Sequence, residues 1–211
     1  MAETTVLYCT SNREDEVFEQ KIKNKLLDGI GDKPLLSVSQ KPIVFGHNIC
    51  VGDVGASYRN LYLQLRIGAL AATTDYIQIV ESDQLYPPGY FEIEPRHELY
   101  MYKSLYVLRH WDPTHFLQKE YGVLTVIVSR LFLLYRLELQ LGKIFEWGQS
   151  PRIGGLFHKR RWAQFDVGAP VITVKTPNGL SSTTGSIVGV APVLTLPHWG
   201  SAAELSRELG L

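Results

Sequence analysis

The sequence has only two cysteines, Cys9 and Cys50, among its 211 residues. Each stands in or beside an apolar run, which predicts buried free thiols in a reducing compartment and argues against a disulfide framework. Charge of one sign is also not in excess, because lysine plus arginine and aspartate plus glutamate both total 21. A nucleic-acid contact would therefore need a local basic patch.

A secretory signal and a long hydrophobic run are missing as well. The first residues, MAETT, have neither a basic start nor a long apolar segment. The stretch 123–141 approaches membrane-spanning length, but Arg130, Arg136 and Glu138 interrupt it. A strand followed by an amphipathic helix explains it better, so we expect a soluble cytoplasmic protein.

Strand and helix patterns alternate along the first 150 residues. Short β-branched and aromatic runs predict strands, and apolar residues at helical spacing predict helices. The expected strands are 5–10, 35–39, 43–45, 76–80, 123–129 and 143–147. The first expected helix is capped by Ser11 or Asn12, and the second by Ser57. The third begins at residue 130 and is closed by Gly142. This order predicts an α/β fold with a mainly parallel sheet.

The composition changes near residue 150, where glycine, proline, serine and threonine become frequent. We expect residues 1–149 to form the core and residues 150–211 a loop-rich extension packed on it. Within the extension, 171–174 and 192–196 are possible strands and 202–209 a terminal helix.

Two carboxylates follow the predicted strand 76–80, in the run Glu81-Ser82-Asp83. Ligands bind at the carboxyl ends of strands in an open α/β sheet, and alternation points Glu81 and Asp83 to the same side. Such oxygen ligands suit Mg²⁺ or Mn²⁺ and, through the ion, a diphosphate. The alternative is a pair of solvated loop acids.

Other segments around these acids favour a nucleotide site. Residues 10–13 follow the first strand, where a nucleotide could rest, although an ordinary strand-turn-helix unit has the same pattern. The segment 46–55 carries glycines without Walker or dinucleotide-binding spacing.

Three motifs together carry a family resemblance. They are Tyr8-Cys9-Thr10-Ser11-Asn12, Gly52-x-x-Gly55-x-Ser57-x-x-Asn60 and Ile79-Val80-Glu81-Ser82-Asp83, with a further match from Arg136-Leu137 to Gly142-Lys143-Ile144. They resemble GT-A glycosyltransferases, in particular the family-2-like group and its small stand-alone members from phage and environmental sequences. The resemblance covers about the first 150 residues and implies a GT-A, Rossmann-like fold and the transfer of a sugar, with a hexose expected, from a nucleotide-diphospho-sugar.

The resemblance also implies roles for individual residues. Asp83 would be the direct ligand of Mn²⁺ or Mg²⁺, Glu81 a ribose or water-mediated contact, and His198 a third metal ligand. The nucleotide-sugar, with a UDP-sugar favoured, would contact Thr10, Ser11, Asn12, Arg13, Gly52, Ser57, Asn60, Glu81 and Ser82.

The base that would deprotonate the acceptor is missing from its usual position, where this chain has Ser129-Arg130. Asp112, Glu120 and Glu146 are candidates to replace it. Transfer with retention of configuration, or no catalysis, are the alternatives.

The acceptor is not fixed by these motifs. A glycan or a hydroxylated nucleobase in DNA is compatible with the resemblance, and a phage-encoded protein would act in the host cytoplasm. The basic cluster Lys159-Arg160-Arg161 could close over the diphosphate, form a solvated surface, or contact a nucleic acid together with Trp162.

Two other classes of protein remain open. A nucleotidyltransferase usually begins with a glycine-rich basic loop, and residues 8–13 contain no glycine. A non-catalytic nucleotide-sugar binder would keep Glu81 and Asp83 and lack a base.

Overall fold

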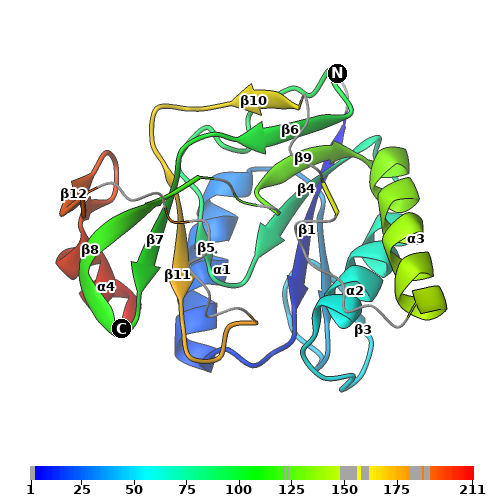
Figure 1. The fold of residues 1–211 in the computed structure, drawn as a ribbon, viewed down its shortest axis with the longest axis horizontal. Helices are drawn as coiled ribbons and strands as arrows, with labels where there is room; N and C mark the ends of the chain where they lie inside the picture. The colour runs from blue at the N-terminus through cyan, green and yellow to red at the C-terminus, as the bar shows by residue number, and fades with distance from the viewer. Residues whose placement is uncertain are drawn as a thin grey trace.

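A computed structural model describes residues 3–120, 122, 124–147, 156–157, 162–180, 187 and 191–211, without the side chains of 144–147. In this part of the chain, strands form a large sheet, a smaller sheet and a short hairpin, and helices cover the sheets (Figure 1). The mixed α/β class expected from the alternating patterns is confirmed.

The large sheet has the strand order β10-β6-β9-β4-β1-β2-β3. Its strands are β1 (Thr4–Thr10), β2 (Leu35–Ser39), β3 (His47–Cys50), β4 (Tyr76–Glu81), β6 (Leu99–Tyr102), β9 (Val126–Ser129) and β10 (Ala163–Phe165). The run β3-β2-β1-β4 is parallel, whereas β9 runs antiparallel to both β4 and β6. The sheet is thus mainly parallel, and Glu81 is the last residue of β4, the strand at one end of this parallel run.

The small sheet has the order β5-β11-β7-β8. Its strands are β5 (Gln84–Leu85), β7 (Leu105–Arg109), β8 (Asp112–Lys119) and β11 (Val171–Lys175), and β12 (Thr195–Leu196) with β13 (Gly200–Ser201) forms the hairpin. Because β5 begins three residues after β4 ends, the two sheets meet at the turn formed by Ser82 and Asp83. Residues beyond 150 contribute β10 to the large sheet and β11 to the small one.

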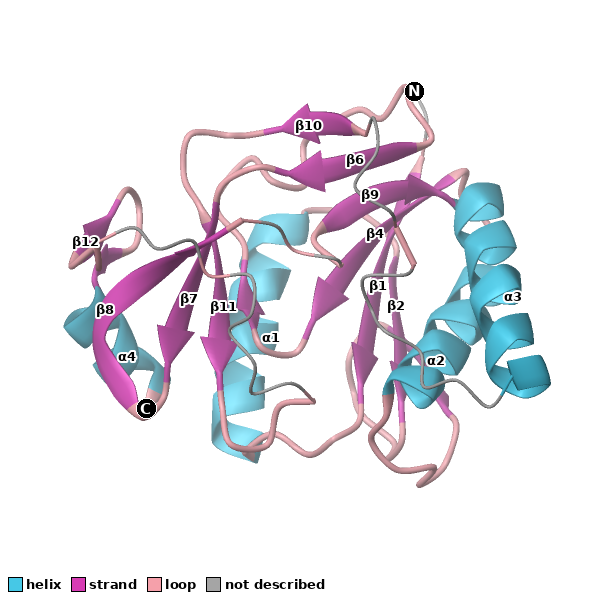
Figure 2. Ribbon diagram, in the orientation of Figure 1, coloured by secondary structure: helices cyan, strands magenta, loops and turns pink. Residues whose placement is uncertain are grey.

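The helices are α1 (Glu16–Ile30), α2 (Tyr58–Ala71), α3 (Arg130–Trp147) and α4 (Ala202–Leu209). Alternation along β1 separates two layers of the core: Leu7 packs in a cluster with residues of α2 and α3, and Val6 packs with residues of α1. Helices α2 and α3 lie side by side (Figure 2). A third cluster packs α1 and α4 against one face of the small sheet.

The predicted cap of α2 is confirmed, and the predicted cap of α1 is wrong. Ser57 Oγ accepts the backbone N–H of Asn60 at 3.1 Å. In α1 the cap is Asp15, whose carboxylate accepts the N–H groups of Val17 and Phe18. Asn12 lies before the helix in a left-handed conformation, with φ 54°.

The predicted end of α3 at Gly142 is wrong, and so is the strand 143–147, because α3 continues to Trp147. Glycine in a helix interior costs only about 1 kcal/mol relative to alanine, which packing readily offsets. The expected strand 43–45 is also wrong, since side chains rather than a strand ladder hold this loop. Ser37 Oγ donates to the Phe45 carbonyl, and Asn48 Oδ1 accepts the N–H of Ile43.

Of the remaining sequence expectations, some are confirmed and others are wrong. The strand at 171–174 and the helix 202–209 are confirmed, and the strand near 192–196 is limited to β12. Cys9 is buried, whereas Cys50 is exposed, contrary to prediction, because β3 is the edge strand of the large sheet. No helix among the described residues is long and apolar enough to span a membrane.

Candidate functional site

A cavity of about 390 Å³ opens where the carboxyl ends of β1 and β4 face the small sheet. Its lining combines the loop after β1, the loop before α2, the turn after β4, and residues of β8 and β11. This is the edge of a parallel sheet at which ligands bind in open α/β folds.

One wall of the cavity is built by polar side chains that fix backbone segments. The amide of Gln40 pairs with the backbone of Gly55 in both directions, donating to the carbonyl at 2.8 Å and accepting the N–H at 3.1 Å. The amide of Gln64, on α2, donates to the carbonyls of Thr10 at 2.9 Å and Val38 at 3.1 Å. The ends of β1 and β2 and the loop before α2 are therefore held together.

The acids occupy the turn between the two sheets. The side-chain amide of Gln84 donates to Glu81 Oε2, and the backbone N–H of Glu81 donates to the hydroxyl of Tyr86 at 3.0 Å. The carbonyl of Asp83 accepts the N–H of Val174, on β11, at 2.7 Å. The small sheet thereby fixes the position of the turn.

Burial dominates the electrostatics of both acids. The pKa of Glu81 is raised to about 7, mainly by burial and in part by the charge of Asp83. Burial likewise raises the pKa of Asp83, against the opposing charges of Lys175 and Lys119. It lowers the pKa of Lys119, and the Glu81 carboxylate opposes that change. Two acids and two lysines thus act on one another electrostatically across the cavity.

Seven of the residues predicted for the nucleotide-sugar or the metal line this cavity. They are Thr10, Ser11, Ser57, Asn60, Glu81, Ser82 and Asp83. The amide nitrogen of Asn60 also donates to the carbonyls of Val54 and Gly55, so it supports the loop before α2.

Three of the predicted nucleotide-binding residues do not line the cavity. Asn12 Oδ1 accepts the N–H groups of Gln40 at 2.9 Å and Lys41 at 2.8 Å, so this side chain joins the loops after β1 and β2. Arg13 and Gly52 are exposed on the surface.

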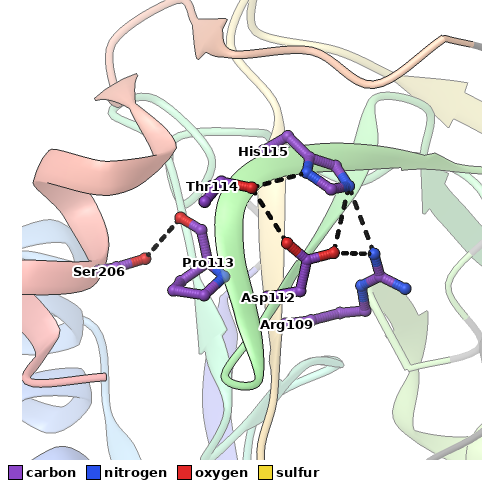
Figure 3. A network of polar contacts seen from close by, with 6 residues as sticks. All are labelled: Arg109, Asp112, Pro113, Thr114, His115 and Ser206. Carbon is purple, nitrogen blue, oxygen red and sulfur yellow. Dashed lines mark hydrogen bonds and ion pairs between the residues drawn. The ribbon is translucent and has the colours of Figure 1, made fainter.

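Of the three candidate acceptor bases, Asp112 and Glu120 do not line the cavity. Asp112 lies at the start of β8, where its carboxylate accepts hydrogen bonds from Arg109 at 2.5 Å and Thr114 at 3.0 Å, with His115 Nε2 at 3.7 Å (Figure 3). Glu120 is exposed directly after β8 and is not part of the lining. The side chain of Glu146, in the last turn of α3, falls outside the described residues.

The other predicted contributors lie elsewhere. His198 is exposed in the turn between β12 and β13, with its ring against Trp199 at 4.6 Å between centroids. The basic residues Lys159, Arg160 and Arg161 fall outside the described residues, and Trp162 packs its ring against Phe132 at 5.7 Å.

Glu81 and Asp83 are the residues of the cavity turn that could hold a divalent ion. Among the described residues, no group of three or more histidine, cysteine, aspartate or glutamate side chains could hold a metal. Two carboxylates still fit Mg²⁺ or Mn²⁺ when phosphate and water oxygens complete the coordination, because Mg²⁺ commonly keeps several waters.

Several lining residues were missed at the sequence level: Glu14, Gln40, Gln64, Lys119, Thr173 and Lys175. Gln40 follows directly on β2, so the rule that pointed to Glu81 could have found it. The positions of Lys119 and Lys175 depend on the pairing of the small sheet, which has no local signal.

No family profile and no curated protein sequence matches this chain. Solved structures match its fold. The glycosyltransferase GlyE of Streptococcus pneumoniae matches with a TM-score of 0.51 and 10% identity, over 79% of this chain and 46% of GlyE. Residues 1–349 of S. aureus TarS, in complex with UDP-GlcNAc, match with a TM-score of 0.54 and 12% identity, over 86% of this chain and 61% of TarS.

A third match extends over both chains. A glycosyltransferase involved in the glycosylation of the major capsid of PBCV-1 has a TM-score of 0.51 and 11% identity, over 99% of this chain and 100% of that one. This chain spans about half the length of GlyE and about three fifths of the TarS structure. At these identities the likeness shows the fold, which is GT-A-like, as the sequence motifs implied.

Proposed function

We propose that this protein is a glycosyltransferase that binds a nucleotide-diphospho-sugar in the cavity between its two sheets. The observation that carries the proposal is the position of Glu81, the last residue of β4, and of Asp83, in the turn that follows, because both line a cavity shared with the loop after β1. The fold neighbours are glycosyltransferases, which supports the same class of enzyme.

The two walls of the cavity suit the two parts of such a donor. The polar wall containing Thr10, Ser11 and Ser57 would receive the base and the ribose. Asp83, on the turn, would face the diphosphate. A UDP-sugar is the favoured donor, supported by the TarS neighbour in complex with UDP-GlcNAc, and we expect a hexose to be transferred.

We propose Mn²⁺ or Mg²⁺ as the cofactor, with Asp83 as its direct ligand and Glu81 as a ribose or water-mediated contact. When bound, such an ion stabilises negative charge on the departing diphosphate. Gln84 orients Glu81 for this role through its amide hydrogen bond.

The second substrate would be a hydroxyl group, on a glycan or on a hydroxylated nucleobase in DNA. Its oxygen would bond to the anomeric carbon of the sugar as the bond from that carbon to the diphosphate breaks, and the hydroxyl proton would pass to a carboxylate or to the departing diphosphate. The carboxylates in the cavity lining are those of Glu14, Glu81 and Asp83.

Donor hydrolysis tests the proposal. The protein is incubated with UDP-glucose or UDP-GlcNAc and Mn²⁺, and released UDP is measured. Asp83→Asn should lower the rate about 100-fold or more, as expected for loss of a group that stabilises developing charge. Asp28→Asn, on the exposed face of α1, is the matched control and should retain the rate. Release of pyrophosphate instead would favour a nucleotidyltransferase.

A non-catalytic nucleotide-sugar binder is the second candidate. It is favoured by one observation: Asp112 and Glu120, proposed as acceptor bases, do not line the cavity. Tight UDP-sugar binding with no UDP release, with or without a panel of acceptors, would support this candidate. Absence of nucleotide binding would exclude both.

A further inference from the structure

The small sheet presents one face to the core and the other to the cavity. On β11, Ile172 and Val174 pack with residues of α1 and α4. Alternation along the strand therefore turns Thr173 and Lys175 to the opposite face, and both line the cavity. The carboxyl-terminal part of the chain thus supplies the wall that faces the acids.

Lys119 reaches the same face from β8. The pairing of the strands sets Thr173 of β11 beside Val107 of β7, and Val107 beside Leu117 of β8. Residues directly opposite in a sheet share a face, and so does the residue two positions further along a strand. Lys119 follows Leu117 by two positions and lines the cavity.

The hydroxyl of Thr173 has no partner among the described residues, although its side chain is only 2% exposed. Buried hydroxyl groups are nearly always hydrogen-bonded, because an unpaired one is costly. Thr173 lines the cavity, so a bound molecule would supply the missing partner.

The two lysines bring positive charge to the same cavity. Each interacts electrostatically with Glu81 and Asp83. Neither forms an ion pair with a carboxylate in the described part of the chain, where the observed pairs involve other residues. Two ammonium groups beside a hydroxyl that lacks a partner form a surface suited to a phosphate-bearing ligand.

We propose that Lys119, Lys175 and Thr173 bind the diphosphate of the donor, with the two ammonium groups and the hydroxyl donating to its oxygens. This inference rests on the proposed function, because it assigns the residues that hold the donor's diphosphate. It also predicts a component of binding that needs no divalent ion, since the lysines themselves supply positive charge.

Calorimetric titration of the full chain with UDP and with uridine tests the inference, in Mn²⁺ and in EDTA. Lys119→Met and Lys175→Met should each weaken UDP binding about 10-fold or more in both conditions, as expected for a charged hydrogen bond. Uridine affinity should not change, because uridine has no phosphate. Lys103→Met, an exposed lysine outside the cavity, is the control and should match the wild type.

Thr173→Val separates binding from folding. Valine has nearly the shape of threonine and removes a hydroxyl that has no partner, so the urea midpoint of unfolding should stay equal or rise. UDP affinity should nevertheless fall by about 3-fold to 10-fold, the loss of one hydrogen bond. Weaker binding together with equal or greater stability is not expected of a residue whose role is only to support the fold.

The outcomes separate this inference from the proposed function. If the wild type binds neither UDP nor uridine, the proposed function fails. If it binds UDP and the three variants bind UDP equally well, the diphosphate assignment is wrong and the proposed function stands. Loss of both UDP and uridine binding in a variant that remains folded would also overturn the assignment, because the defect would not be specific to phosphate.

Discussion

Gln84 donates its side-chain amide to Glu81, with 2.5 Å between Nε2 and Oε2. The amide oxygen of Gln84 accepts the hydroxyl of Tyr86 at 2.9 Å, and that hydroxyl accepts the backbone N–H of Glu81. The three residues close a ring of hydrogen bonds around the turn. The first acid of the motif is therefore held by its own neighbours in sequence.

Replacing Gln84 by leucine should destabilise the protein by about 1–3 kcal/mol, because the Glu81 carboxylate and the Tyr86 hydroxyl would each lose a partner in a buried site. The pKa of Glu81 should rise further, since the bond from Gln84 lowers it. Urea unfolding at constant pH measures the change. Gln20→Leu, which removes an exposed bond to Asn24 on α1, is the control and should change stability by less than about 0.5 kcal/mol. Equal effects of the two substitutions would contradict the prediction.

The stability of the protein should depend on pH through Glu81. Its pKa is about 7 in the folded protein against an ordinary value of 4.5, so between these values the folded state holds a proton that the unfolded chain has released. This contribution to stability is complete below about pH 4.5 and is lost as the pH rises to about 7. The raised pKa of Asp83 acts in the same direction.

Urea unfolding between pH 5 and pH 8 measures this dependence. The wild type should lose stability on the order of 1–3 kcal/mol across the range. Glu81→Gln should show a flatter profile, because the amide does not titrate. Parallel profiles for the two proteins would show that Glu81 is not the group responsible.

Substitution by alanine should change the stability of the protein in opposite directions at two helical glycines. A Cβ at Gly68, on α2, would overlap the side chain of Leu7 on β1, so Gly68→Ala should cost about 1–3 kcal/mol. At Gly142, on α3, no described atom lies within 4 Å of the added carbon, so Gly142→Ala should stabilise by about 0.5–1 kcal/mol. Thermal or urea unfolding of both variants checks the pair, and a destabilising Gly142→Ala would contradict the position of Gly142 inside α3.

The sequence could predict the parts of the site whose signals are local. Glu81 and Asp83 follow a short apolar strand, and Ser57 directly precedes an amphipathic helix, so a few neighbouring residues define each position. The lysines have no such signal, because β7 must pair with both β8 and β11 before Lys119 and Lys175 share a face. Gly142 gives a misleading local signal, because a glycine does not by itself end a helix and α3 continues past it to Trp147.

The cavity is bounded on one side by the loop that Gln40 holds beside the large sheet, and on the other by residues of β8 and β11 in the small sheet. Substitutions in the loop held by Gln40 alter one boundary and leave the pairing of β7, β8 and β11 intact. Under the proposed function, donor preference and charge neutralisation can therefore be engineered independently. A variant library at residues 54–58, screened against different nucleoside diphosphates, would make direct use of that modularity.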